Sequence, residues 1–431
     1  MDMYALGLIA VFVGVLVITL TEKADKTIIS LLGAIITLTL LSMRLNVPLI
    51  DGLKYVISHY IDFPTLIIMF SVLIIGEVIG EAGVFQWLSI KLVKITKGDP
   101  KKILLLLVIL TIVLSAFLTI IAAAVIMSRL TVTISKALDV DSRPFLITEA
   151  VSISIGGLTS LIASPASILI SQEENLTFAF FVVTTMPFAI VVAIIVSLLL
   201  LKLVNISEEV SLDRKQVLME FDEWSVVPSK SLFYLAIVII IGMTIGFFIY
   251  PAFIVAFTGA TLFLLIRQLP FDRVAEKIEW SDILFFIGIF TVVGGVEETG
   301  VLEEIGHSLA EISAGNVIFP LLLILWISGV ASGFLDEVTI ALTFLPIVRE
   351  LLVAGGFQVY RDVFITALIL STNLGGCLTP IGTPANLIIL STAKKEGKIV
   401  SFKEFMRLGL VIVIVNLIIA SVYLLTLVFL T

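Results

Sequence analysis

The chain has 431 residues, of which 59% are apolar and only 14% are charged, and its mean hydropathy is +1.21. This composition excludes a soluble domain and indicates a membrane protein with many spans. A single cysteine, Cys377, excludes a disulfide framework and a cysteine-based metal site, and the net charge of −8 belongs to the loops and gives no sign of a nucleic-acid partner.

The first half of the chain contains hydrophobic runs long enough for membrane-spanning helices, which need about 20 residues each. In this half we expect helices at 4–20, 28–42 and 64–81, an amphipathic segment at 84–97, short limbs at 103–115 and 121–133, a glycine-interrupted span at 144–171 and a last span at 177–204. The polar segment 205–230 is expected to be a linker.

The second half has the same order of parts. We expect helices at 231–249, 252–266 and 281–297, a segment at 301–313, short limbs at 317–332 and 338–353, a glycine-interrupted span at 361–392 and a last span at 405–430. Ser-Ala-Phe-Leu at 115–118 lies 217 residues before Ser-Gly-Phe-Leu at 332–335, and Gly156-Gly157 lies 219 residues before Gly375-Gly376. We therefore predict two repeats, 1–204 and 231–431.

The short limbs decide the predicted topology. At 1.5 Å per residue, limbs of about 11–15 residues reach roughly 17–22 Å, which is too short to cross a membrane comfortably. We therefore expect 103–133 and 317–353 to be re-entrant hairpins with tips near Thr119 and Asp336. The predicted fold is an all-α polytopic membrane protein with two inverted repeats, each of five transmembrane helices, a re-entrant hairpin and a broken helix.

The distribution of positive charge tests this topology independently. The predicted arrangement places 22 of the 26 Lys and Arg residues on one side and leaves Arg44, Lys54, Arg349 and Arg361 on the other. Because cytoplasmic loops are enriched in Lys and Arg, the first side is predicted to be the cytoplasm. Both termini then lie on the extracytoplasmic side of the inner membrane, and the linker lies in the cytoplasm. The first hairpin enters from the cytoplasm and the second from outside.

Asp336 and Glu337 are adjacent acids between two hydrophobic runs. Burial disfavours the charged form of a carboxyl group, so at least one of them is expected to be able to carry a proton. The alternative is that the hairpin tip reaches a wet surface, where both acids are solvated. No Lys or Arg stands near them in the sequence, so we expect no simple ion pair and no cationic side chain at the site.

Glycines interrupt the spans 144–171 and 361–392. In the second span, Gly375-Gly376 and Gly382 precede Thr383-Pro384-Ala385-Asn386, which has the form of a helix start. Carbonyls that end the first half-helix can bind Na⁺, and amides that begin the second face an anion. A structural kink is the alternative. In the first half, the equivalent stretch offers hydroxyl groups for a neutral or anionic substrate at Thr159, Ser160, Ser164 and Ser167.

These motifs resemble the ion transporter superfamily, closest to its branch of arsenite permeases, NhaD-type sodium/proton antiporters and the melanosomal P protein, with citrate and dicarboxylate carriers as cousins. The resemblance covers essentially the whole chain. It rests on Gly83-Val84-Phe85, on Ser-Gly-Phe-Leu-Asp-Glu-Val-Thr at 332–339, and on Asn-Leu-Gly-Gly at 373–376 running into Thr-Pro-Ile-Gly-Thr-Pro-Ala-Asn at 379–386. Glu149 matches a common family acid and is a candidate proton relay; the alternative is that it only bonds a helix backbone.

The resemblance implies a dimer whose protomers each have a scaffold and a transport unit that moves like an elevator. It implies an ion site formed by Asp336, Glu337, Thr339, Asn373, Thr379, Gly382, Thr383 and Asn386, with Na⁺ held by Asp336, Thr339, Asn373, Thr383 and Asn386. The first-half site departs from the family pattern, because its usual ligands are replaced at Thr119, Ser154, Ser164 and Ser167. One ion site, or proton coupling, fits this chain better than two sodium ions.

We therefore expect a secondary active transporter of a small ion in a lipid bilayer, with Na⁺ or H⁺ as coupling ion and no other cofactor. Sodium/proton exchange and arsenite-type efflux lead, and a sodium-coupled carrier of di- or tricarboxylates or other anions is the alternative. A degenerate channel or a non-transporting membrane protein is the alternative class. We do not expect an enzyme, because the sequence holds neither an intramembrane protease motif nor a zinc motif.

Overall fold

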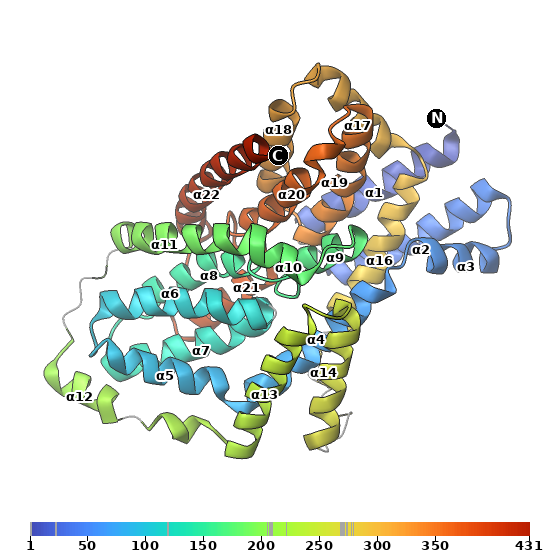
Figure 1. The fold of residues 1–431 in the computed structure, drawn as a ribbon. Coiled ribbons are helices and arrows are strands. Elements are labelled where there is room, and N and C mark those ends of the chain that lie inside the picture. Colours follow the sequence, from blue (N-terminus) through green and yellow to red (C-terminus); the bar gives the residue numbers. More distant parts are fainter. Residues whose placement is uncertain are drawn as a thin grey trace.

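The computed structural model describes residues 2–21, 24–118, 120–204, 206, 210–220, 222–267, 272, 275–276, 278 and 280–431. Within these residues every regular element is a helix, which confirms the predicted all-helical fold (Figure 1). In the described part of the chain, seven helical stretches are long and apolar enough to cross a membrane: Met3–Thr21, Lys26–Leu45, Phe63–Ala82, Ile120–Leu138, Phe178–Leu203, Trp280–Glu297 and Phe402–Leu430. This agrees with the prediction of a polytopic membrane protein.

The first half and the linker run in the order that the sequence indicates. The helices are α1 (Met3–Thr21), α2 (Lys26–Leu45), α3 (Leu49–His59), α4 (Phe63–Ala82), α5 (Val84–Ile95), α6 (Pro100–Phe117), α7 (Ile120–Leu138), α8 (Arg143–Gly156), α9 (Pro165–Glu173), α10 (Phe178–Phe180), the π-helical η1 (Phe181–Thr185), α11 (Met186–Leu203), α12 (Leu212–Glu220) and the 3-10 turn η2 (Glu223–Val226).

The second half follows the same plan. Its helices are α13 (Lys230–Gly246), α14 (Ala252–Arg267), α16 (Trp280–Glu297), α17 (Val301–Ser313), α18 (Ile318–Ser332), α19 (Glu337–Ala354), the 3-10 turn η3 (Gln358–Tyr360), α20 (Arg361–Gly375), α21 (Pro384–Lys395) and α22 (Phe402–Leu430).

Two helices were not predicted. The helix α3 has 11 residues and α12 has nine, so neither contains a long hydrophobic run. The first begins after Pro48, whose ring fixes φ near the helical value and favours a helix start. A search for long apolar runs misses both helices. The amphipathic α3 is stabilised by packing one face, where Gly52 and Val56 are buried, against the rest of the protein.

Three of the four hairpin limbs are longer than predicted, whereas the fourth, α18, agrees with the predicted 317–332 to within one residue. The helices α6, α7, α18 and α19 have 18, 19, 15 and 18 residues, and of these four α7 is the one whose described residues combine the length and the hydropathy of a membrane span. The helix α7 continues to Leu138, past the predicted end at 133, through Ser135 and Lys136, which interrupt the apolar pattern. Hydroxyl side chains are compatible with this helix because they can bond to the preceding turn: Thr133 Oγ1 donates to the Arg129 carbonyl at 2.9 Å. A re-entrant course therefore depends on where the tips lie and not on limb length.

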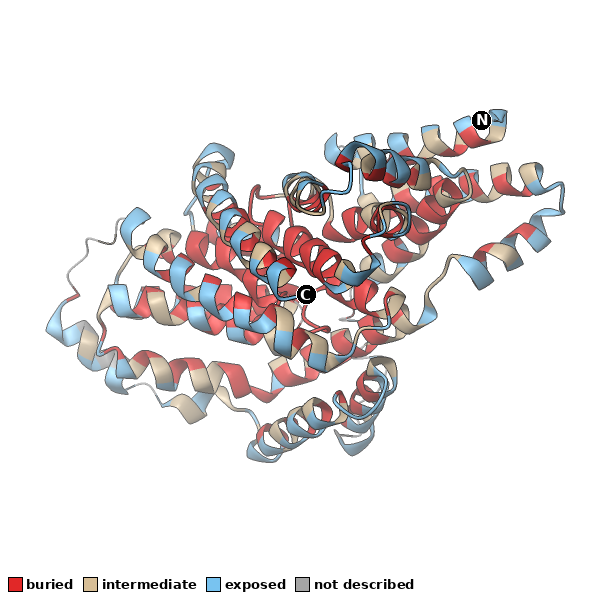
Figure 2. Ribbon diagram, turned by 45° about the horizontal axis from the view of Figure 1, so that its top comes forward, coloured by how far each residue is buried: buried red, intermediate tan, exposed pale blue. Residues whose placement is uncertain are grey.

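Burial is concentrated around the helices that carry the breaks (Figure 2). In α8 every residue from Phe145 to Gly156 is buried, and in α20 every residue from Val363 to Gly375 is buried. Outer helices instead expose large apolar side chains, such as Val238 on α13 and Val422 on α22. This is the distribution that a lipid environment favours, since exposed apolar side chains have no cost there.

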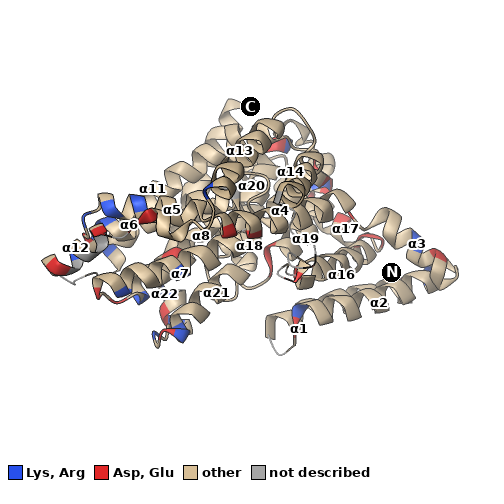
Figure 3. Ribbon diagram, turned by 90° about the horizontal axis from the view of Figure 1, so that it is seen from below, with Lys and Arg blue, Asp and Glu red and all other residues tan. Residues whose placement is uncertain are grey.

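Charged residues lie mostly at helix ends and in loops (Figure 3). At one end of the molecule, the loops near 139–143 and 396–404 are joined by ion pairs from Lys136 to Glu396, Arg143 to Glu404 and Lys398 to Asp141, at 2.6, 3.0 and 3.2 Å. The predicted topology assigns all six residues to the cytoplasmic side. Their proximity is what that assignment requires.

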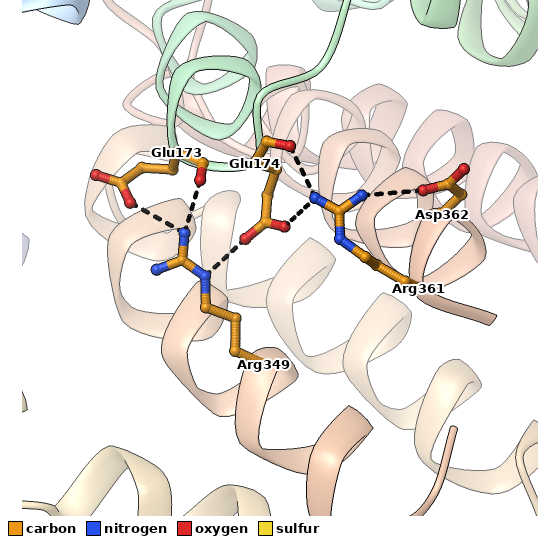
Figure 4. Close-up of polar contacts among 5 residues, drawn as sticks. All are labelled: Glu173, Glu174, Arg349, Arg361 and Asp362. Carbon is orange, nitrogen blue, oxygen red and sulfur yellow. Dashed lines mark hydrogen bonds and ion pairs between the residues drawn. The ribbon is translucent and has the colours of Figure 1, made fainter. Parts of the chain in front are cut away.

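The opposite set of loops is joined by an arginine–glutamate cluster (Figure 4). Glu174, just after α9, accepts from Arg349 Nε of α19 and from Arg361 Nη2 of α20, both at 2.6 Å. Arg349 also pairs with Glu173 at 3.0 Å, and Arg361 pairs with Asp362 at 3.2 Å. Only 6% of the Glu174 side chain is exposed. One buried carboxylate thus ties the end of the first broken helix to the second hairpin and the second broken helix.

Glu174→Gln is expected to lower the stability of the purified protein by about 1–2 kcal/mol, because it leaves two arginines without their shared charged acceptor. Thermal unfolding in mild detergent measures the effect. The matched control is Asp51→Asn, which breaks the exposed Lys54–Asp51 pair and should change stability by less than about 0.5 kcal/mol. Equal unfolding temperatures for the two variants would contradict this role of Glu174.

Candidate functional site

The two interrupted spans break at corresponding places, and each second half-helix begins with a cap. Ser164 accepts from the Ser167 amide at 3.4 Å and precedes α9, while Thr383 accepts from the Asn386 amide at 3.3 Å and precedes α21. Pro165 and Pro384 follow in the first turn, as predicted for the second break. Each break therefore presents the N-terminus of a half-helix, with its unpaired amides, toward the protein interior.

Equivalent hydrogen bonds in the two halves hold each break to its hairpin. Ser160 Oγ donates to the Ala116 carbonyl at 2.8 Å, and Thr379 Oγ1 donates to the Gly333 carbonyl at 2.6 Å. Ser115 bonds the Ile153 carbonyl and Ser332 bonds the Thr372 carbonyl, at 3.3 and 2.5 Å. Each residue of a first-half contact has its counterpart in the second-half contact either 217 or 219 residues later, which are the offsets found in the sequence. The contacts that shape the two breaks thus occur twice.

The two breaks also touch each other. Asn373 Nδ2 donates to Ser167 Oγ at 3.2 Å, which joins the end of α20 to the start of α9. A side chain at Gly157 would collide with Asn373 Oδ1, so glycine is needed there for this close approach. At Gly376 an added Cβ would lie 3.4 Å from Ser154 Oγ, the corresponding contact from the other half. The breaks of both halves therefore form one central seam.

Several buried oxygen atoms in this seam have no hydrogen-bond partner among the described residues. They are Ser154 Oγ, Asn373 Oδ1 and Asn386 Oδ1, and all three residues are at most 2% exposed. Asn386 Nδ2 is fully used, since it donates to the Gly376 and Thr379 carbonyls at 3.0 Å each. Leaving a buried oxygen without a partner costs free energy, and such oxygens suit a small hard cation.

Glu337 lies against the first break. It is the first residue of α19, it is 4% exposed, and it accepts from Ser164 Oγ at 3.2 Å. Ser164 is the cap of α9, so the carboxyl group lies at the positive end of that half-helix. The second hairpin tip is therefore buried beside both breaks, and the alternative of two solvated acids does not apply to Glu337.

Asp336 has a cationic neighbour that the sequence did not predict. Its Oδ2 atom lies 3.4 Å from Lys26 Nζ, which lies equally far from Asp282 Oδ1. The expectation of no ion pair and no cationic side chain is therefore wrong. The reason is distance along the chain: Lys26 precedes Asp336 by 310 residues, and no local pattern relates the start of α2 to the tip of a hairpin.

A cavity of about 30 Å³ lies where these elements meet, which we call the site cavity. It is lined by Lys26, Met69, Leu73, Ile120, Ile121, Pro165, Ile168, Asp282, Phe286, Asp336, Glu337, Val338 and Pro384. Since a cavity needs roughly 10–15 Å³ to hold one water molecule, this cavity has room for a small ion or about two water molecules. Both half-helix starts and both hairpin acids thus face one small enclosed space.

Two larger cavities flank the site. The first-half cavity, of about 480 Å³, lies between α4, α5 and α7 and shares Leu73 and Ile121 with the site cavity. The second-half cavity, of about 620 Å³, lies between α3, α16, α17 and α19 and shares none of its lining residues with the site cavity. In this conformation the site therefore adjoins the first-half cavity and, of these two cavities, not the second-half one.

The remaining candidate residues lie in other places. Glu149 is fully buried on α8, where Thr131 donates to one carboxylate oxygen and the other has no partner in the described part of the chain. Thr159 and Ser160 line a separate apolar cavity of about 650 Å³. Thr339 is buried near the hairpin tip, and Gly382 packs against the Gly376 carbonyl. Thr119 lies outside the described residues.

Comparison with known proteins places this chain in a family. The model of a family described as "Citrate transporter" matches residues 16–362 and 332–430. An uncharacterized transporter of Mycobacterium tuberculosis is 30% identical over 422 residues, which cover 96% of this chain and 97% of the relative. The P protein of Mus musculus is 23% identical over 501 residues, covering 97% of this chain and 59% of the relative.

Two solved structures share the fold. The YdaH transporter of Alcanivorax borkumensis has a TM-score of 0.57 at 13% identity, covering 87% of this chain and 88% of its own. MtrF of Neisseria gonorrhoeae, described within a class of antimetabolite efflux pumps, has a TM-score of 0.56 at 14% identity, covering 98% of this chain and 94% of its own. At these identities the likeness concerns the fold alone.

Proposed function

Because this chain belongs to the citrate transporter family and is a membrane transporter, we propose that it is a secondary active transporter of a small ion, coupled to protons or to a single sodium ion. The observation that carries the proposal is Glu337. A carboxyl group buried within the membrane is expensive and is retained where it carries an ion or a proton. This one faces an enclosed cavity together with Asp336 and both half-helix starts.

The proposed coupling-ion site combines the hairpin tip with the second break. Glu337 takes up the proton, and Na⁺ binds to oxygens from Asp336, Thr339, Asn373, Thr383 and Asn386. The unpartnered oxygens of Asn373 and Asn386 support an oxygen-ligated cation at this place. Glu149, buried without a cationic partner among the described residues, is proposed as a proton relay.

The proposed mechanism is alternating access between two inverted repeats, with elevator-like movement of the hairpins and broken helices in a homodimer. The doubled contacts of the two breaks support the repeat. Positive charge supports a cytoplasmic linker and extracytoplasmic termini. Since the site cavity shares lining residues with the first-half cavity, which reaches Arg129 and Val226, and none with the second-half cavity, we assign this conformation as open toward the cytoplasm.

Substrate choice is decided within the same site. Cation/proton exchange uses Asp336 and Glu337 in turn, and arsenite-type efflux uses the hydroxyls and amides of the breaks. A second candidate is a di- or tricarboxylate or another anion, which Lys26 and the two half-helix N-termini favour. A cavity of about 30 Å³ holds a small ion and is too small for a tricarboxylate, so this conformation favours the small ion.

Transport in proteoliposomes with an imposed pH gradient and a pH-sensitive dye tests the proposal. Na⁺, Li⁺, arsenite and citrate are added in turn to vesicles with wild-type protein, with Asp336→Asn, and without protein. We expect one of the solutes to trigger proton movement in the wild type only, because the variant lacks the charged oxygen at the hairpin tip. Silence with all four solutes, in protein that is folded and monodisperse, would contradict coupled transport of this class.

A further inference from the structure

Lys26 joins two parts of the molecule. It is the first residue of α2, Asp282 lies in the first turn of α16, and Asp336 caps α19 at the hairpin tip. Its Nζ atom lies 3.4 Å from a carboxylate oxygen of each acid and 4.7 Å from the centre of the Phe285 ring. The side chains of the two acids are each only 14% exposed, so solvent screens these contacts weakly.

The two ion pairs of Lys26 differ in the elements that they join. The helices α2 and α16 are fixed to each other, since Thr27 Oγ1 donates to the Ser281 carbonyl at 3.0 Å and Gly288 packs directly against Ser30. The Lys26–Asp282 pair therefore lies within one rigid pair of helices. The Lys26–Asp336 pair instead crosses from that pair to the hairpin, so it must break whenever the tip moves away from α2 and α16.

The charges around Lys26 are unbalanced. Asp282 of α16 and Asp336 and Glu337 of α19 line the site cavity with it, and the other lining residues, from α4, α7, α9, α16, α19 and α21, are apolar or proline. One ammonium group thus faces three carboxyl groups in a space of about 30 Å³. Any further cation that enters the cavity competes with Lys26 for the same carboxylate oxygens, because attraction between charges at this distance is strong in a poorly solvated site.

We propose that Lys26 is an internal cation that competes with the coupling cation for Asp336, and thereby links occupancy of the ion site to the position of the hairpin. With the site empty, Lys26 holds the tip against α2 and α16. When a cation binds at Asp336, it neutralises the carboxylate, the ion pair with Lys26 weakens, and the tip is released. The inference rests on the proposed cation coupling. It adds Lys26 as the residue that transmits cation binding to the hairpin tip.

Competition predicts opposite effects for two substitutions. Lys26→Gln removes the competitor, so the Na⁺ concentration for half-maximal transport should fall by about three- to tenfold. Asp282→Asn leaves Lys26 with Asp336 as its main partner, so the same concentration should rise. Lys26→Arg keeps the charge and should restore a value close to that of the wild type. Unchanged values in both charge-removing variants, or shifts in the same direction, would overturn the proposal.

A distance measurement separates this inference from the transport proposal. Spin labels are placed at Ile35 on α2 and Val353 on α19, both 61% exposed, while the native Cys377 is fully buried and does not label. Distances are measured by electron paramagnetic resonance in NaCl and in choline chloride. We expect Na⁺ to change the distance in the otherwise native protein, and Lys26→Gln to show the changed distance in choline.

Each other outcome has a distinct meaning. A response to Na⁺ that Lys26→Gln neither mimics nor alters would overturn the role of Lys26 and leave sodium coupling intact. A change on Lys26→Gln without any response to Na⁺ or to a pH step would support the ion-pair contact and overturn a cation as its competitor. No change of distance in any of these experiments would overturn both the role of Lys26 and the proposed cation coupling.

Discussion

Replacing Glu337 with Gln is expected to reduce cation-coupled transport to the level of protein-free vesicles. Gln has nearly the same shape and can still accept the hydrogen bond from Ser164, but it neither releases a proton nor carries a charge. Loss of a charged ligand worth about 1.5–3 kcal/mol weakens cation binding by roughly ten- to a hundredfold. Loss of the titrating group removes proton coupling altogether. Flux in proteoliposomes measures both losses.

The matched control is Glu311→Gln, which changes an exposed glutamate on α17 and should leave flux unaltered. Size-exclusion chromatography shows whether each variant is folded. Since Glu149 is a fully buried carboxyl group that lacks a cationic partner in the described part of the chain, Glu149→Gln is measured alongside. Coupled flux that survives Glu337→Gln and disappears in Glu149→Gln would move the coupling carboxyl group from the hairpin tip to α8.

The largest loss of stability is expected for Gly375→Ala. Gly375 ends α20 where this helix crosses α18, and an added Cβ would collide with the Gly329 backbone carbonyl and lie 2.9 Å from Ser332 Cβ. No flexible side-chain end can move aside there, so α18 and α20 must separate. Overpacking of this kind costs about 1–3 kcal/mol, and the backbone contact places Gly375→Ala at the upper end.

Separation of α18 and α20 would also stretch the hydroxyl bonds between them, including Ser328 to Ser371 at 2.6 Å. Thermal unfolding in detergent measures the loss of stability. The control is Gly242→Ala in the middle of α13, where an added Cβ meets nothing within 4 Å and should stabilise the helix by up to about 1 kcal/mol. Wild-type stability of Gly375→Ala would show that the hairpin limb packs less rigidly than the structure indicates.

Much of the fold could be predicted because membrane helices are recognisable in the sequence as long apolar runs. Long apolar runs located α1, α2, α4, α16 and α22 to within a few residues. The short helices α3 and α12 were not predicted, since neither contains a long apolar run. The limb α7 was predicted too short, because Ser135 and Lys136 interrupt the apolar pattern before the helix ends at Leu138.

The site was partly predictable for the same kind of local reason. Each glycine pair is followed by a Thr or Ser cap and a proline, which favour the start of a new helix, so the two breaks could be located from the sequence. Lys26 and Asp282 could not, because contacts over hundreds of residues leave no local pattern. Their only signal was indirect: each is a charged residue at the start of a predicted span, on the side that the charge distribution assigns to the cytoplasm.

Proton release on addition of Na⁺ is the measurement that tests the central claim most directly. Purified protein in weakly buffered detergent solution is mixed with NaCl, and a pH indicator reports the protons released. If Glu337 exchanges a proton for the coupling cation, the wild type should release about one proton per protomer and Glu337→Gln none. Equal release from both proteins would contradict the assignment of Glu337 as the coupling group.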